Sequence, residues 1–98
     1  MADVVTSHNP DAHRYEARLD GELAGFLEYR SSVGLVNLTH TEVDDRFEGH
    51  GIGSALARFA LDDLRGDDSV RVVVTCPFII SWIGKHPEYA EFLETSAP

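Results

Sequence analysis

Cysteine, basic side chains and long apolar runs are scarce in this chain of 98 residues, and each scarcity excludes a class of protein. The single cysteine, Cys76, rules out an intramolecular disulfide. No apolar run approaches the roughly 20 residues that a membrane helix needs. The first residues have neither the basic nor the apolar region of a signal peptide. We therefore expect a cytoplasmic protein.

Acidic residues outnumber basic ones by 17 to 8, which gives a formal charge of -9. A nucleic-acid binder would show a basic patch, and an anionic membrane would repel this chain, so we expect neither partner. An amine or a basic peptide is electrostatically favoured, although the charge can equally serve solubility alone. Any bound phosphate must be held by main-chain N–H groups and a few basic side chains.

The first part of the chain predicts a hairpin preceded by a loose arm. Residues 1–12 are polar and aperiodic, which is typical of a loose N-terminal arm. Arg14–Leu19 alternates apolar and polar residues and predicts a half-buried strand. Asp20-Gly21 is a strong signal for a two-residue hairpin turn. Glu22–Tyr29 is then the return strand.

A third strand, Leu35–Val43, completes an antiparallel meander after a turn at residues 30–34. Strict alternation along this strand predicts that one face begins apolar and ends with two titratable side chains. That face holds Val36, Leu38, His40 and Glu42. The ordinary explanation for its polar end is a strand that emerges into solvent.

The middle of the chain predicts a strand–helix–strand unit. Apolar residues spaced by three and four predict a helix over Ile52–Leu64, with Gly66 as its stop. Val70–Cys76 is β-branched and apolar, as in a strand that is covered on both faces. Such a unit leaves its two strands parallel. The sequence thus predicts one α+β domain over residues 1–98, with a mixed, mostly antiparallel sheet and a central βαβ unit.

The C-terminal part predicts two short helical segments. Pro77 suits the first position of a helix, and the apolar residues 78–85 continue it. Pro87 prevents its extension. Residues 88–94 then form an amphipathic turn or two, with Tyr89, Phe92 and Leu93 buried.

A glycine-rich loop, Arg46–Ser54, joins the third strand to the helix. Gly49, Gly51 and Gly53 tolerate positive φ and let the main chain approach another surface. The N–H groups of such a loop, with those of the first helical turn, form an anion site suited to phosphate or pyrophosphate. The alternative is a tight turn without a ligand. The loop lacks the Gly-x-Gly-x-x-Gly of dinucleotide folds and the Gly-Lys-Ser/Thr of the Walker loop.

The spacing Arg-x-x-Gly-x-Gly, here Arg46 to Gly51, resembles the signature of the GNAT superfamily of N-acetyltransferases. The rest of the chain after Arg14 resembles a small stand-alone branch of that superfamily. The resemblance implies two parallel strands that splay apart at the loop and hold acetyl-coenzyme A. It implies pantetheine near Thr41 and Val43, and a cofactor site that includes Arg46, Gly49, Gly51, Ile52, Gly53 and Ser54. Pyrophosphate would take N–H groups of Arg46, Gly49, Gly51, Gly53 and Ser54. Independently of the resemblance, His50 either bonds near a phosphate or faces water. Lys85 either pairs with the nucleotide phosphates or serves as favourable charge at a helix C-terminus.

Four residues are candidates for a role in acetyl transfer to an amine. Cys76 would be the N-cap of the helix at Pro77, where a helix N-terminus stabilises a thiolate, and it either accepts the acetyl group or only lines the pocket. His40 and Glu42 are candidate general bases. Tyr89 could be a general acid, although its helical spacing favours core packing. The histidines and the cysteine show no zinc-binding spacing, so we expect no metal site.

The resemblance therefore predicts an acetyl-coenzyme A dependent N-acetyltransferase for an unidentified amine. The chain lacks the first helix pair and the last strands of the fuller superfamily pattern, and these segments often build the acceptor pocket. The alternative is a non-catalytic module that binds coenzyme A or acyl-CoA. A monomer and a homodimer paired through an exposed strand edge are both compatible with the sequence.

Overall fold

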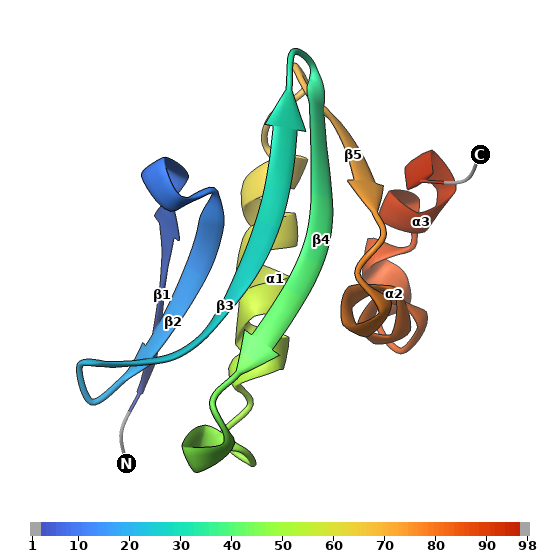
Figure 1. Cartoon of the computed structure of the whole chain (residues 1–98). Helices are drawn as coiled ribbons and strands as arrows, with labels where there is room; N and C mark the ends of the chain where they lie inside the picture. The colour runs from blue at the N-terminus through green and yellow to red at the C-terminus, as the bar shows by residue number, and fades with distance from the viewer. Residues whose placement is uncertain (1–2, 97–98) are drawn as a thin grey trace.

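A computed structural model describes residues 3–96 of the chain, and for residues 94–96 the backbone alone. No helix in this range is long and apolar enough to cross a membrane. The elements follow one another along the chain as Figure 1 shows. They are β1 (Val4–Asn9), η1 (Pro10–Ala12), β2 (Arg14–Leu19), β3 (Glu22–Ser32), β4 (Leu35–Val43), η2 (Asp45–Phe47), α1 (Ile52–Arg65), β5 (Arg71–Val74), α2 (Pro77–Gly84), η3 (Pro87–Tyr89) and α3 (Glu91–Ser96).

The strands form one sheet in the order β1-β2-β3-β4-β5. The first four strands pair antiparallel, and β4 pairs parallel with β5 after the crossover helix α1. Helix α1 lies behind the sheet, and α2 and α3 lie together beside β5 (Figure 1). The predicted α+β fold with its central βαβ unit is confirmed, and β4 has the predicted bounds.

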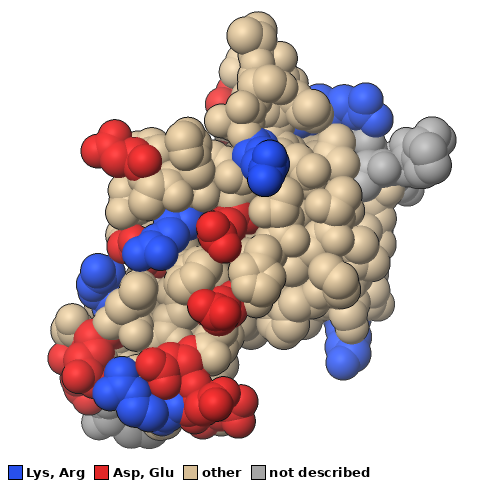
Figure 2. All heavy atoms as spheres, in the orientation of Figure 1, with Lys and Arg blue, Asp and Glu red and all other residues tan. Residues whose placement is uncertain are grey.

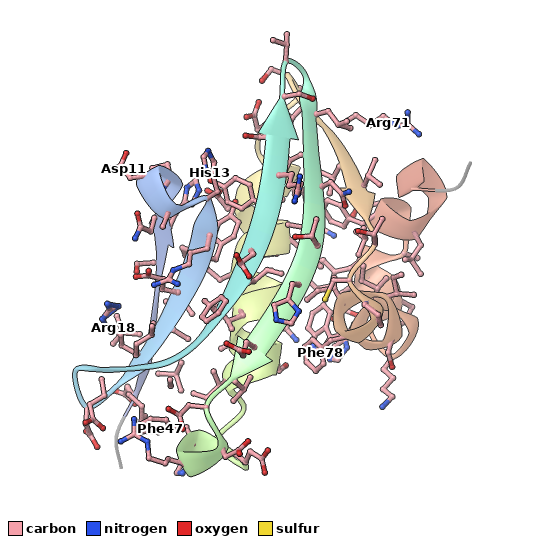
Figure 3. All side chains as sticks on the ribbon, in the orientation of Figure 1. Asp11, His13, Arg18, Phe47, Arg71 and Phe78 are labelled. Atoms are coloured by element: carbon pink, nitrogen blue, oxygen red, sulfur yellow. The ribbon has the colours of Figure 1, made fainter. Side chains whose placement is uncertain are left out.

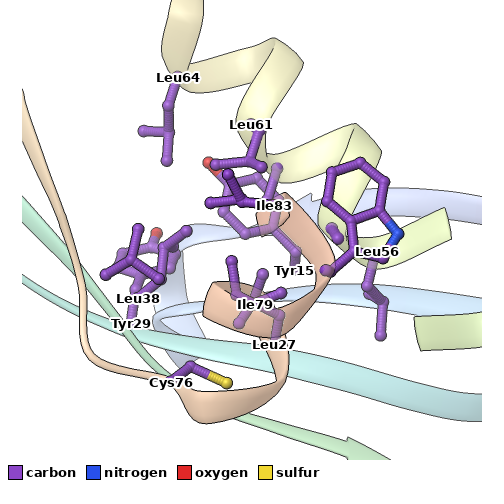
Figure 4. Packing of buried hydrophobic residues seen from close by; sticks show 14 of the residues in the cluster. Tyr15, Leu27, Tyr29, Leu38, Leu56, Leu61, Leu64, Cys76, Ile79 and Ile83 are labelled. Atoms are coloured by element: carbon purple, nitrogen blue, oxygen red, sulfur yellow. The ribbon is translucent and has the colours of Figure 1, made fainter. Parts of the chain in front are cut away.

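A single apolar cluster joins the helix-facing side of the sheet to α1 and α2 (Figure 4). Fully buried leucine and isoleucine side chains dominate it, and each contributes about 1.5–3 kcal/mol relative to an exposed position. They are Leu27, Leu38, Ile52, Leu56, Leu61, Ile79 and Ile83. Tyr15 closes one end, where its hydroxyl donates to Asp63 at 2.8 Å. Burial and the neighbouring Asp63 raise the pKa of Tyr15.

The prediction of a loose arm over residues 1–12 is wrong for the part of it that the structure describes. Val4–Asn9 pairs with β2 over its whole length, and Pro10–Ala12 forms a short helix capped by the Asn9 side chain. Met1 and Ala2 lie outside the described residues. This strand lies at the edge of the sheet, where main-chain hydrogen bonds to β2 hold it in place. It therefore does not need the alternation of apolar and polar side chains from which strands were predicted.

Other element bounds differ from the expected ones. The return strand β3 extends to Ser32, so only Val33 and Gly34 make the second turn. Gly34 has a φ of 74°, which suits a tight hairpin. Strand β5 is shorter than Val70–Cys76 because the chain leaves the sheet after Val74. The residues after Pro87 divide into η3 and α3.

Gly25 in β3 lets the start of α1 approach the sheet. A Cβ at Gly25 would lie 2.7 Å from the carbonyl oxygen of Glu42 and 2.9 Å from Cγ2 of Ile52. We expect Gly25→Ala to lower the free energy of unfolding in urea by about 1–3 kcal/mol. The matched control is Gly84→Ala in α2, where a Cβ meets nothing within 4 Å. That variant should be neutral or up to about 1 kcal/mol more stable, and equal stabilities of the two would contradict this account.

Candidate functional site

Strands β4 and β5 pair over only part of their length. Their ladder ends at the pair Leu38↔Val74. The carbonyl oxygen of Leu38 then accepts the N–H groups of both Thr75 and Cys76, each at 3.0 Å, as the chain turns away from the sheet. Figure 1 shows the two strands diverging toward the end of β4 that leads into η2. The expected splayed strands are therefore confirmed. Among the described residues, no strand pairs with residues 39–43 on the β5 side, and we call this break in the pairing the gap.

The main chain of Val43 faces this gap. Asp44 donates its N–H to the carbonyl oxygen of Ala24 in β3, at 2.8 Å. Successive residues of a strand direct their N–H and C=O groups to opposite sides. The groups of Val43 therefore point away from β3, into the gap. An extended chain that lies there can pair with Val43 as an added strand does.

The loop before α1 ends in a row of unbonded main-chain N–H groups. Gly49 and Gly51 have φ of 86° and 74°, a region that glycine adopts without strain. Gly51 is the N-cap of α1, and the first helical bond runs from Ala55 N–H to its carbonyl oxygen. Among the described residues, no acceptor bonds the N–H groups of Gly49, Gly51, Ile52, Gly53 and Ser54. With the positive end of the α1 dipole, they form an anion cradle.

Four other amides of the loop are already bonded. Phe47 and Glu48 donate their N–H groups to the carbonyl oxygens of Asp44 and Asp45, at 2.9 Å and 3.3 Å. Arg46 donates its N–H to Oδ1 of Asp44 at 2.9 Å. His50 donates its N–H to the carbonyl oxygen of Phe47 at 3.4 Å. The expected contribution of the Arg46 amide to a pyrophosphate site therefore requires that its bond to Asp44 breaks.

The Arg46 guanidinium is also held by Asp44. Its Nε and Nη2 lie 3.3 Å and 3.2 Å from the carboxylate oxygens of Asp44, and its Nη1 lies 4.0 Å from Glu22. These bonds hold the pKa of Asp44 below its usual range. Ion pairs between exposed side chains are weak because solvent screens them, so an anion can compete for Arg46. Figure 2 shows acidic and basic side chains gathered at this end of the molecule.

Helix α2 packs against the first turn of α1. The indole N–H of Trp82 donates to Oγ of Ser54 at 2.9 Å. The ring of Phe78 lies over Gly53, where a Cβ would come within 2.6 Å of its Cζ. Figure 3 shows Phe78 at the end of α2 that faces β4. Phe78 is exposed, and its ring lies next to the cradle at Gly53.

Cys76 lies where β4 and the start of α2 are in side-chain contact. It is the N-cap of α2, as predicted, and is 2% exposed. Its Sγ lies 3.3 Å from Oγ1 of Thr41, on the opposite side of the gap. The two side chains bridge β4 and the start of α2. Thr41 is half-buried, so the pair separates the cradle side of the gap from the core.

A β-bulge at Thr39 reverses the alternation of β4. Leu38 pairs with Tyr29, but His40 pairs with the preceding residue of β3, Glu28. Thr39 is thus an extra residue that has no partner in the ladder. Every side chain after it lies on the opposite face from the one that strict alternation predicts.

The prediction that His40 and Glu42 share a face with Val36 and Leu38 is wrong. Val36 and Leu38 are buried against the helices, whereas the side chains of His40 and Glu42 are 56% and 62% exposed. They lie on the open face of the sheet, where Glu42 pairs with Phe26. They still face one another, with His40 Nε2 3.9 Å from Glu42 Oε1.

The remaining candidates lie further from the gap. His50 is an exposed residue of the loop. Lys85 is exposed and follows α2, at the opposite end of that helix from Cys76. Tyr89 is 3% exposed, and its hydroxyl donates to Oδ1 of Asp62 at 2.7 Å. That bond, with burial, raises the pKa of Tyr89, and core packing is confirmed for it.

Asp44, Thr39 and Phe78 belong to the site, although the sequence analysis assigns them no role. The sequence did contain a signal for Asp44, because an Asp side chain commonly accepts the N–H of the residue two positions later, in an Asx turn. The sequence contained no signal for the bulge at Thr39, since the bulge depends on the register of β4 against β3. Phe78 is an exposed aromatic side chain, and only the approach of α2 to α1 places its ring over Gly53.

Comparison with known proteins relates the chain to one family. Residues 14–92 match the family described as GCN5-related N-acetyl-transferase. Protein NATD1 from Bos taurus is 34% identical over 95 residues, which cover 93% of this chain and 83% of that protein. Protein NATD1 from Mus musculus and from Homo sapiens are each 32% identical over 95 residues, covering 93% of this chain and 86% and 83% of the respective relatives.

Burial of Cys76 predicts slow alkylation of the native chain. The thiol should reach iodoacetamide only when α2 opens locally. We expect its rate to be on the order of 100-fold below that of an exposed thiol on the same helix. The comparison is the double variant Cys76→Ser, Ser81→Cys, since Ser81 is exposed, and intact mass against time measures both rates. Similar rates would show that solvent reaches Cys76 freely.

Proposed function

The chain belongs to the GCN5-related N-acetyltransferase family, whose general activity is acetyl transfer, and we propose that it transfers the acetyl group of acetyl-coenzyme A to an amine. The observation that carries this proposal is the set of unbonded main-chain N–H groups of Gly49 and of residues 51–54, at the start of α1. A diphosphate is the anion that such a set suits.

The residues around the gap fit coenzyme A. The five free amides would hold its pyrophosphate without any titratable group, and Arg46 would join them on leaving Asp44. The N–H and C=O groups of Val43 would pair with its extended amide-containing arm. Phe78 would cover that arm beside Gly53. When bound, acetyl-coenzyme A supplies a thioester carbonyl that an amine can attack.

The amine would approach from the open face of the sheet. His40 and Glu42 lie there, on the strand that borders the gap, and the acidic chain attracts a protonated amine. His40 Nε2 would accept the proton that the amine loses, and Glu42 would favour the resulting imidazolium. Because Cys76 is buried and contacts Thr41, we assign it to the lining of the gap and the transfer to a direct attack.

Binding of coenzyme A tests the cradle. We expect the chain to bind it in calorimetry, and Gly51→Val to weaken binding at least about 10-fold, because a β-branched residue cannot keep a φ of 74°. Gly66→Val, at a φ of -78° near the far end of α1, is the matched control and should bind normally. Absence of binding to the wild-type chain at millimolar coenzyme A would overturn the proposal.

Turnover with a panel of amines tests the chemistry. His40→Gln and Glu42→Gln should each lower the rate of acetyl transfer and flatten its pH profile. The loss of rate should be roughly 100-fold or more for His40→Gln, because His40 accepts the proton in this proposal. Glu88→Gln, on an exposed residue of η3, should keep the wild-type rate. Intact mass after incubation with acetyl-coenzyme A alone should show no acetyl group on Cys76. An acetylated Cys76 that passes its acetyl group to an amine would replace the direct attack.

A non-catalytic module that binds coenzyme A or acyl-CoA is the second candidate. The exposure of His40 and Glu42 favours it, because more than half of each side chain faces solvent and the open face gives an acceptor little enclosure. Tight binding of coenzyme A without acetylation of any amine would select this function. Turnover that depends on His40 or Glu42 would exclude it.

A further inference from the structure

The gap between β4 and α2 ends at the contact between Thr41 and Cys76. Their side chains approach to 3.3 Å from opposite sides. Figure 4 shows Cys76 at the edge of the apolar cluster, next to Ile79 and Leu27. A group that enters the gap past Val43 therefore meets this pair before it can reach the core.

The space behind the pair is filled. Leu27, Leu38 and Ile79 have no exposed surface, and Cys76 itself is 2% exposed. Protein interiors are packed like organic crystals, so an added methylene there must displace a side chain. The carbonyl oxygen of Leu38 holds Cys76 N–H at 3.0 Å, which prevents the start of α2 from retreating easily.

We propose that Thr41 and Cys76 set an upper limit on the size of the acyl group that this site accepts. This inference rests on the proposed function, since it concerns the acyl group that coenzyme A carries into the gap. A two-carbon acyl group ends at the Thr41–Cys76 contact, and longer groups collide with it. The pair therefore determines specificity for the donor, and neither residue needs to react.

The limit can be measured by binding alone, with probes that cannot transfer their acyl group. The probes are coenzyme A and its S-ethyl, S-propyl and S-butyl thioethers, with affinities from calorimetry on the full chain. We expect the wild-type chain to bind the butyl thioether at least about 10-fold more weakly than the ethyl thioether. Cys76→Ala should reduce this ratio to within about 3-fold, mainly by improving butyl binding.

Two further variants keep the test independent of folding. Thr41→Ser removes one methyl group from the other side of the gap and should reduce the same ratio. Thr75→Ala, next to Cys76 in the chain but exposed and bonded to Asn37 at 3.0 Å, is the control and should keep the wild-type ratio. Because each result is a ratio within one variant, a general loss of stability does not imitate it.

The outcomes separate this inference from the proposed function. Equal wild-type affinity for the ethyl and butyl thioethers, or a ratio that neither Cys76→Ala nor Thr41→Ser changes, would overturn the size limit while coenzyme A binding stands. Failure of the wild-type chain to bind coenzyme A itself would overturn the proposed function and the size limit together.

Discussion

The carbonyl oxygen of Leu38 accepts two N–H groups, and this bond pattern is the constraint on which the site depends. It ends the ladder between β4 and β5 and turns the chain into α2 at Cys76. A parallel ladder that continued would occupy the main chain of Val43 and leave no gap. The parting of the strands therefore creates an unpaired strand edge inside the fold, where a ligand can pair without exposing the edge to other chains.

The bulge at Thr39 determines which face of the sheet each later side chain of β4 occupies. After it, Thr41 points toward Cys76 and the helices, whereas His40 and Glu42 point to the open face. In the proposed function, the donor side of the gap is consequently packed and the acceptor side is open. One extra residue would thus place the proposed size limit and the proposed proton acceptor on opposite sides of one strand.

In the proposed function, this acidic chain would hold a diphosphate through main-chain amides at the cradle. The guanidinium of Arg46 is largely neutralised by Asp44, and more distant charges are screened over about 8–10 Å at ordinary ionic strength. The free amides of the cradle do not titrate, and those of Ile52, Gly53 and Ser54 are oriented by the first turn of α1 before any ligand arrives. The net charge of the chain therefore does not decide whether the cradle can bind an anion.

Local sequence determined the elements and the cradle of this protein. The alternation of Leu35–Val43, the helical period after Ile52 and the glycines of the loop each act over a few neighbouring residues, so the strand, α1 and the free amides followed from them. Pairing between distant segments decided the rest. The β1 edge strand is held by main-chain bonds to β2. The face of His40 and Glu42 was decided by the register of β4 against β3, because a single bulge reverses every later side chain and no local pattern encodes it.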